Sequence, residues 1–283
     1  MPPGSSLDPQ TIADLLTRFR DRGGDPDRLI VIGGAASVHW AVALMPDSDV
    51  PFRTVDLDFQ MQAPHGFEKL LERFADAVGG ELALPGREHH TPELAHVEIP
   101  DFYGPSDNLI VDFLPGPYGL RAHDVERRAR YVDVEAGDGR VLQVRMAHPV
   151  HLLVGTAENY MRLPRYRHEA ILIRVDGLIS VVRRYLGQVA QEAAASRGDS
   201  AENRRMERDA RWSMQQLLRL SAKPAYADYH RDTGRDLTDA IPTKDEAPVD
   251  PKFWASEYPQ RVAMIRARRQ ASLQRQRKGH RSR

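Results

Sequence analysis

The sequence contains no cysteine among its 283 residues. This absence excludes disulfide bonds, zinc sites built on thiolates and catalysis by a cysteine nucleophile. Any metal ion must therefore be held by oxygen or imidazole ligands. Oxygen ligands favour magnesium or manganese, so a metal cofactor of this chain is expected to be Mg²⁺ or Mn²⁺.

Long apolar runs are also missing. No stretch approaches the roughly 18 to 20 uninterrupted apolar residues of a membrane-spanning helix. The start, MPPGSSLDPQ, lacks the basic residues and apolar centre of a signal peptide. We therefore expect a cytoplasmic protein with no membrane partner. With 41% hydrophobic residues, the chain can form one large domain or two modest ones.

Acidic residues are absent from the end of the chain, although the whole sequence is balanced at 40 acidic and 40 basic residues. The last acid is Glu257, and every charge beyond it is basic. A solvated terminal helix is one interpretation of this segment. The other is an arm that binds RNA or DNA, because clustered arginines release counterions from a polyanion.

Helical and extended patterns alternate over the first half of the sequence, and helical patterns fill the part after Ala147. Strands are predicted over 28–33, 52–61, 94–100 and 108–116, with a hairpin turning at Asp138 and Gly139. Helices are predicted over 7–23, 34–44, 66–80, 148–161, 169–186 and 202–220. The fold class is therefore α/β (α+β), a mixed sheet with flanking helices followed by a C-terminal helical domain. We place the domains at 1–146 and 147–222, with 223–283 as an extended tail that ends in the basic segment.

Three aspartates occur within apolar strand patterns. Asp56 and Asp58 are separated by one residue, so in a strand they project from the same face about 6 to 7 Å apart. Asp112 is flanked by Val111 and Phe113, where a charge is costly unless it is paired or bound to a metal. Three such carboxylates can converge on one or two divalent cations, an arrangement suited to phosphoryl or nucleotidyl transfer.

A glycine pair precedes the aspartates. Gly33 and Gly34 lie between a predicted strand and a predicted helix, where missing side chains expose backbone N–H groups at a helix N-terminus. Ser37 follows one turn later and offers a hydroxyl donor. Glycine turn, helix and Asp-x-Asp strand together predict a site for a triphosphate and its metal ions.

The order Gly33-Gly34, Asp56-Leu57-Asp58 and Asp112 resembles the DNA polymerase β-like nucleotidyltransferase superfamily. The stretches GGAAS and RTVDLDF are most similar to the minimal bacterial nucleotidyltransferases of the abortive-infection toxin (AbiEii-like) group, over roughly residues 28 to 160. The resemblance implies that Gly33, Gly34 and Ser37 bind an NTP and that the three aspartates bind the metal ions. It also implies that Asp112 helps to deprotonate an acceptor hydroxyl.

The resemblance further implies positive charge near the phosphates, which many relatives supply from lysines. Residues 151–177 contain no lysine, and the candidates are Arg162, Arg165, Arg167 and His168. Arginine suits bidentate phosphate contacts, and we assign nucleotide binding to Arg165. Other implied features are a tRNA acceptor that binds through the basic tail, a cognate antitoxin, and a role as the toxin of a toxin–antitoxin or phage-defence system.

Other interpretations stay open. The chain could be a noncatalytic nucleotide- or RNA-binding module on the same fold, or a nucleotidyltransferase for small molecules of the aminoglycoside type. A dinucleotide-binding turn at VIGGAAS, with Asp56 binding ribose, is disfavoured because it leaves Asp112 without a role. The histidines His89, His90 and His96 lack a diagnostic metal-binding spacing, and we expect them in loops.

Overall fold

A computed structural model describes residues 7–48, 53–61, 67–85, 93–195 and 200–281 of the chain, with side chains as far as residue 275. The chain divides into two compact units, Met1–Leu163 and Pro164–Arg283. The predicted domain boundaries at 146 and 222 stay predictions. Within the described residues, no helix is both long and apolar enough to cross a membrane.

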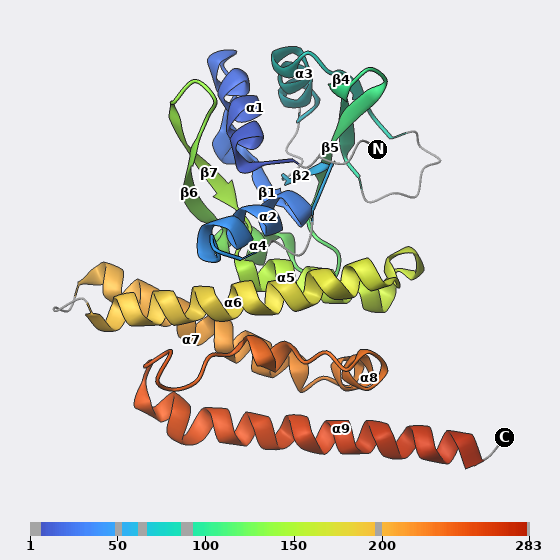
Figure 1. The fold of residues 1–283 in the computed structure, drawn as a ribbon, viewed down its shortest axis with the longest axis vertical. Coiled ribbons are helices and arrows are strands. Elements are labelled where there is room, and N and C mark those ends of the chain that lie inside the picture. Colours follow the sequence, from blue (N-terminus) through green and yellow to red (C-terminus); the bar gives the residue numbers. More distant parts are fainter. Residues whose placement is uncertain (1–6, 49–52, 62–66, 86–92, 196–199, 282–283) are drawn as a thin grey trace. The chain divides into compact units, whose positions relative to one another are not determined.

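The first unit is built on one mixed sheet of seven strands (Figure 1). The order across the sheet is β3-β4-β5-β2-β1-β7-β6, and the pairs β1–β7 and β2–β5 are parallel. The strands are β1 (Ile30–Ile32), β2 (Leu57–Gln60), β3 (Glu81–Ala83), β4 (Ala95–Gly104), β5 (Asp107–Leu114), β6 (Arg130–Glu135) and β7 (Val141–Met146). The helices are α1 (Pro9–Asp21), α2 (Gly33–Leu44), α3 (Phe67–Val78), α4 (Ala122–Arg128) and α5 (Pro149–Arg162).

Helix α1 begins where the sequence predicts it. The Asp8 carboxylate accepts a hydrogen bond from Thr11 N at 2.6 Å, and Pro9 occupies the first turn. The apolar stripe of α1 is buried, including Leu16 and Phe19. The predicted hairpin is also confirmed, because β6 and β7 pair antiparallel around Gly139, which has φ +82°.

An aromatic cluster holds one face of the sheet against α1 and α3. The Phe74 ring of α3 lies 5.3 Å from Phe19 of α1, 5.9 Å from Phe59 of β2 and 5.2 Å from Phe113 of β5, measured between centroids. All four rings are fully buried. Because side chains alternate along a strand, burying Phe59 and Phe113 turns their neighbours Asp58 and Asp112 to the other face.

The second unit is helical, with the 3₁₀ turn η2 (Pro164–Tyr166) at its start. Helices α6 (Glu169–Ala195) and α7 (Ala201–Ser221) are linked by a buried 2.8 Å hydrogen bond from the Tyr185 hydroxyl to Asp209. After them come α8 (Pro224–Thr233), η3 (Leu237–Ala240), the π-helical turn η4 (Phe253–Glu257) and α9 (Tyr258–Arg281). Together with the sheet unit, these helices confirm the predicted α/β (α+β) fold.

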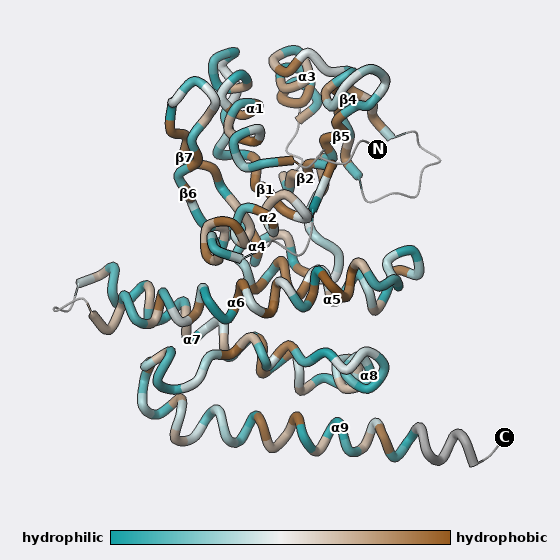
Figure 2. The backbone as a smooth tube through the Cα atoms, in the orientation of Figure 1, coloured by the Kyte–Doolittle hydropathy of each residue, from teal (hydrophilic) through white to brown (hydrophobic). Residues whose placement is uncertain are grey.

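The segment predicted as an extended tail from residue 223 contains two α-helices, and the second agrees with the interpretation of the basic segment as a solvated terminal helix. Residues 224–233 and 258–281 are helical, and α9 is hydrophilic along most of its length (Figure 2). Its anchors are sparse but specific: Ile265 and Ser272 are buried, and Arg269 pairs with Asp236 at 2.5 Å. Ion pairs between residues far apart in sequence and a few buried contacts therefore order a segment whose composition favours solvation.

Candidate active site

Asp58 and Asp112 lie directly opposite each other on the parallel strands β2 and β5. Residues in register on adjacent strands project to the same face of a sheet. Both carboxylates therefore leave the sheet on the face opposite the aromatic cluster. Each aspartate is half-buried, so its carboxylate stays accessible to a ligand. The flanking apolar residues are buried and hold the two strands in place.

Gly33 brings the start of α2 against Asp58. It has φ +63°, a conformation that L side chains rarely adopt, and Ile32 just before it pairs with Asp58 across β1 and β2. A Cβ atom at position 33 would overlap the Asp58 carboxylate. The predicted glycine turn therefore lies directly against the predicted metal ligand, at a helix N-terminus whose partial positive charge favours anions.

Gly34 lies against Thr54, whose hydroxyl in turn holds the Asp56 carboxylate. Thr54 was not predicted as a site residue. A Cβ at position 34 would overlap the Thr54 side chain, which is buried. The Thr54 hydroxyl lies 3.0 Å from Asp56 Oδ1, to which it donates. Strand β2 begins only at Leu57, so the prediction that Asp56 lies within a strand is wrong. A hydrogen bond from Thr54, rather than strand pairing, fixes the Asp56 carboxylate.

The carboxylates repel one another. Burial raises the pKa of Asp112 to about 6, and the charges of Glu93 and Asp56 add to this rise while His96 opposes it. Burial also raises the pKa of Tyr103 to about 12, with further contributions from Asp56 and other acids, and its hydroxyl donates to Val55 O at 2.8 Å. Asp56 thus lies close enough to both groups to act on them electrostatically.

Two further residues stand beside Asp112. His96 of β4 is the cross-strand partner of Asp112 on β5, so the prediction of a loop histidine is wrong; His89 and His90 lie outside the described residues. Potential ligand atoms of Glu93, His96 and Asp112 all lie within 4.8 Å of one another. The signal available in the sequence was the alternation in LAHVEIP, which places His96 opposite the buried Ala95 and Val97.

Ser37 and Arg165 are the other residues predicted to bind nucleotide, and they belong to different units of the chain. Ser37 is buried within α2, and its hydroxyl donates to Gly33 O at 2.8 Å. Arg165 is exposed in η2 of the second unit, with its guanidinium carbon 5.1 Å from the centroid of the Tyr166 ring. Nucleotide contacts of these two residues stay predictions.

The chemistry of the three predicted carboxylates suits a divalent cation. Among the described residues, however, the potential ligand atoms that lie within 4.8 Å of one another are those of Glu93, His96 and Asp112, so metal binding by Asp56 and Asp58 stays a prediction. Asp56, Asp58 and Asp112 supply hard oxygen ligands of the kind that Mg²⁺ and Mn²⁺ prefer. Burial and, to a smaller extent, the charges of Glu93 and Asp56 raise the pKa of Asp112, and a bound cation would favour its charged form. The space beside Gly33 is occupied by the Asp58 carboxylate, so the glycine turn allows the start of α2 to approach this predicted ligand closely.

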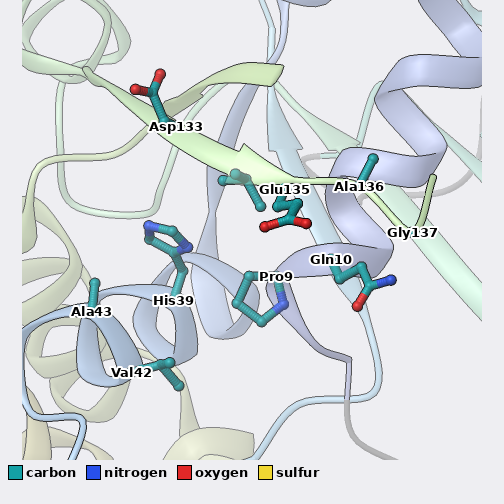
Figure 3. Close-up of a pocket in the computed structure, with 10 residues that line it drawn as sticks. Pro9, Gln10, His39, Val42, Ala43, Asp133, Glu135, Ala136 and Gly137 are labelled. Atoms are coloured by element: carbon teal, nitrogen blue, oxygen red, sulfur yellow. The ribbon is translucent and has the colours of Figure 1, made fainter. Parts of the chain in front are cut away.

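A separate hollow of about 490 Å³ in the same unit is lined by residues of α1, α2 and β6 (Figure 3). His39 extends from α2 toward the strand that carries Asp133 and Glu135 (Figure 3). Its ring is buried, its Nδ1 atom has no hydrogen-bond partner, and burial lowers its pKa to about 4. None of the three predicted metal ligands lines this hollow.

Comparisons with known proteins leave the family open. No family model and no curated protein matches the sequence. A similar solved structure is the solution structure of the antibiotic-resistance factor ANT(2'')-Ia, with a TM-score of 0.36 and 15% sequence identity. The similarity covers 65% of this chain and 91% of that chain. It is too low to transfer a function, so the functional interpretation depends on the geometry of the site.

Proposed function

We propose that this chain is a nucleotidyltransferase that uses a divalent cation, Mg²⁺ or Mn²⁺. It transfers a nucleoside monophosphate from an NTP to a hydroxyl acceptor. One observation supports this most: the glycine turn at the start of α2 lies against Asp58, and Asp58 is in register with Asp112. A phosphate-binding backbone and acidic cation ligands are thereby close together at one face of the sheet.

Each group has a role in the proposed reaction. Backbone N–H groups at Gly33 and Gly34 bind the triphosphate, and Asp56, Asp58 and Asp112 hold the cation. When bound, the cation neutralises phosphate charge and favours in-line displacement. The acceptor oxygen forms a bond to the α-phosphorus, the bond from that phosphorus to the bridging oxygen breaks, and pyrophosphate leaves. Asp112 accepts the proton of the acceptor hydroxyl.

The acceptor is proposed to be RNA, with tRNA ends as the first candidate. Support comes from α9, where Arg261, Arg266 and Arg268 are exposed on a helix that follows the last acidic residue of the chain. Exposed arginines attract a polyanion by counterion release. A toxin role, a cognate antitoxin, membership of the AbiEii-like group and a phosphate contact by Arg165 belong to the same proposal.

Label transfer tests the reaction and the acceptor together. The full chain is incubated with each α-³²P-labelled NTP, Mg²⁺ and total cellular RNA, and the products are separated on a denaturing gel. Label on RNA, abolished by EDTA, is expected. Label on an added aminoglycoside but not on RNA would show that the acceptor is a small molecule, and it would still support nucleotidyl transfer. NTP binding without pyrophosphate release would favour the noncatalytic module.

A further inference from the structure

A cluster with a mixed set of donors lies at one side of the proposed cation site. Glu93 and Asp112 each offer a carboxylate oxygen and His96 offers a ring nitrogen, all within 4.8 Å of one another. Ligands about 2.0 to 2.2 Å from a common ion are separated by up to about 4 Å. Small side-chain adjustments would therefore bring these three donors around one cation.

The backbone holds the cluster in place. His96 and Asp112 are paired across β4 and β5, and the segment that carries Glu93 is fixed by a 2.8 Å hydrogen bond from Leu94 N to Phe113 O. On the opposite face, Ala95 and Phe113 are completely buried. Turning either strand would expose that apolar face, so His96 and Asp112 stay on one side of the sheet.

The nitrogen donor distinguishes this cluster from the aspartates. Carboxylate oxygens suit Mg²⁺ and Mn²⁺, whereas an imidazole nitrogen adds affinity for later divalent transition metals such as Co²⁺ and Zn²⁺. We infer that Glu93, His96 and Asp112 form a transition-metal site that binds Co²⁺ or Zn²⁺ more tightly than Mg²⁺. The site shares Asp112 with the proposed function but does not depend on it, because cation binding needs no nucleotide.

The competing explanation is structural. His96 and the two carboxylates could form only a charged cluster that strengthens the pairing of β4 with β5. In that case the loss of the imidazole would lower stability and leave the affinity for metal ions unchanged. Metal affinity and stability must therefore be measured separately.

A Co²⁺ titration without nucleotide tests the site. Visible absorption of the full-length protein is followed in the wild type, His96→Asn, Glu93→Gln and the control His123→Asn, which removes an exposed histidine of α4. Removal of a ligand is expected to weaken Co²⁺ binding by at least about tenfold. Even the loss of a residue that only hydrogen-bonds a metal ligand lowers metal affinity by about 10- to 100-fold. The control should match the wild type, and excess Mg²⁺ should compete poorly with Co²⁺.

Two results would overturn the site: equal Co²⁺ affinity in His96→Asn and wild type, or Mg²⁺ competing as well as Co²⁺. Circular dichroism and urea unfolding confirm that each variant is folded. If His96→Asn does not fold, Glu93→Gln decides the question, because Glu93 lies before β4 rather than within it. Co²⁺ binding without nucleotidyl transfer would refute only the proposed function. Transfer with Mg²⁺ but no selective Co²⁺ binding would refute only this site.

Discussion

Asp58 and Asp112 are direct register partners on parallel strands although 53 residues of sequence lie between them. The strand order inserts β5 next to β2, and the buried phenylalanines at 59 and 113 fix which face the aspartates occupy. The pair therefore depends on the aromatic core as much as on the aspartates themselves.

Replacing Gly33 with alanine is expected to impair the site as well as the fold. The positive φ alone costs about 1 to 2 kcal/mol, and the new Cβ would also displace the Asp58 carboxylate. A displacement of about 1 Å can lower catalysis by about 100-fold. Gly79→Ala is the matched control, because Gly79 has φ +71° and no atom within 4 Å of the added Cβ. Equal transfer rates in the two variants would show that contact with Asp58 is unimportant.

His39 is expected to make the first unit sensitive to acid. Its pKa is about 4 in the folded chain and 6.5 when exposed, so the unfolded state binds a proton first as the pH falls. Its contribution to stability is complete above pH 6.5, is lost as the pH falls from 6.5 to about 4, and amounts to about 3 kcal/mol at most. Urea unfolding, followed by near-ultraviolet circular dichroism, compares wild type with His39→Leu at several pH values. A difference between the two proteins that does not change with pH would refute this assignment.

Phe74→Ala is expected to destabilise the first unit by about 3 to 5 kcal/mol, because a fully buried ring in contact with three others is removed. Tyr118→Ala, which truncates an exposed aromatic residue, should change stability by less than about 0.5 kcal/mol. The midpoints and slopes of urea unfolding measure both effects. A loss below about 1 kcal/mol for Phe74→Ala would contradict the account of the core.

The exposed arginines of α9 are expected to set RNA affinity without contributing to the fold. Replacing Arg261, Arg266 and Arg268 with glutamine should weaken RNA binding and lower the slope of log affinity against log salt by about one for each lost phosphate contact. Deleting the helix is a poorer test, because Arg269 and Arg275 of α9 pair with Asp236 and Asp228 of the same unit. Unchanged RNA affinity and salt slope in the triple variant would favour a small-molecule acceptor.

Much of the fold was predictable because its signals are local. Capping at Asp8, the glycine at the 138–139 turn and apolar periodicity all act within a few residues, and the helices and most strands follow from them. Strand β3 and helix α4 were missed because each is short and has few fully buried residues to mark its apolar face. A solvated terminal helix was one interpretation of the basic segment, but the ion pairs that stabilise α9 could not be predicted, because they join residues far apart in sequence.

The sequence predicted which residues could form the site but not the contacts that hold them in place. The order of the glycines and aspartates indicates the chemistry, whereas the contact of Thr54 with Gly34 exists only after α2 packs against the segment before β2. The same limit applies to His96, whose relation to Asp112 is a cross-strand pairing that sequence spacing does not encode. Local patterns identified candidate residues, and the sheet register determined their neighbours.

The most direct test of the proposed reaction compares pyrophosphate release by the wild type, Asp58→Asn and Asp47→Asn, with Mg²⁺, NTP and cellular RNA. Asp58→Asn preserves shape but removes a cation ligand, whereas Asp47 is exposed in a loop. We predict EDTA-sensitive release by the wild type and Asp47→Asn, and a loss of at least about 100-fold in Asp58→Asn with unchanged circular dichroism. Equal release by Asp58→Asn and wild type would contradict the assignment of this face of the sheet as the active site.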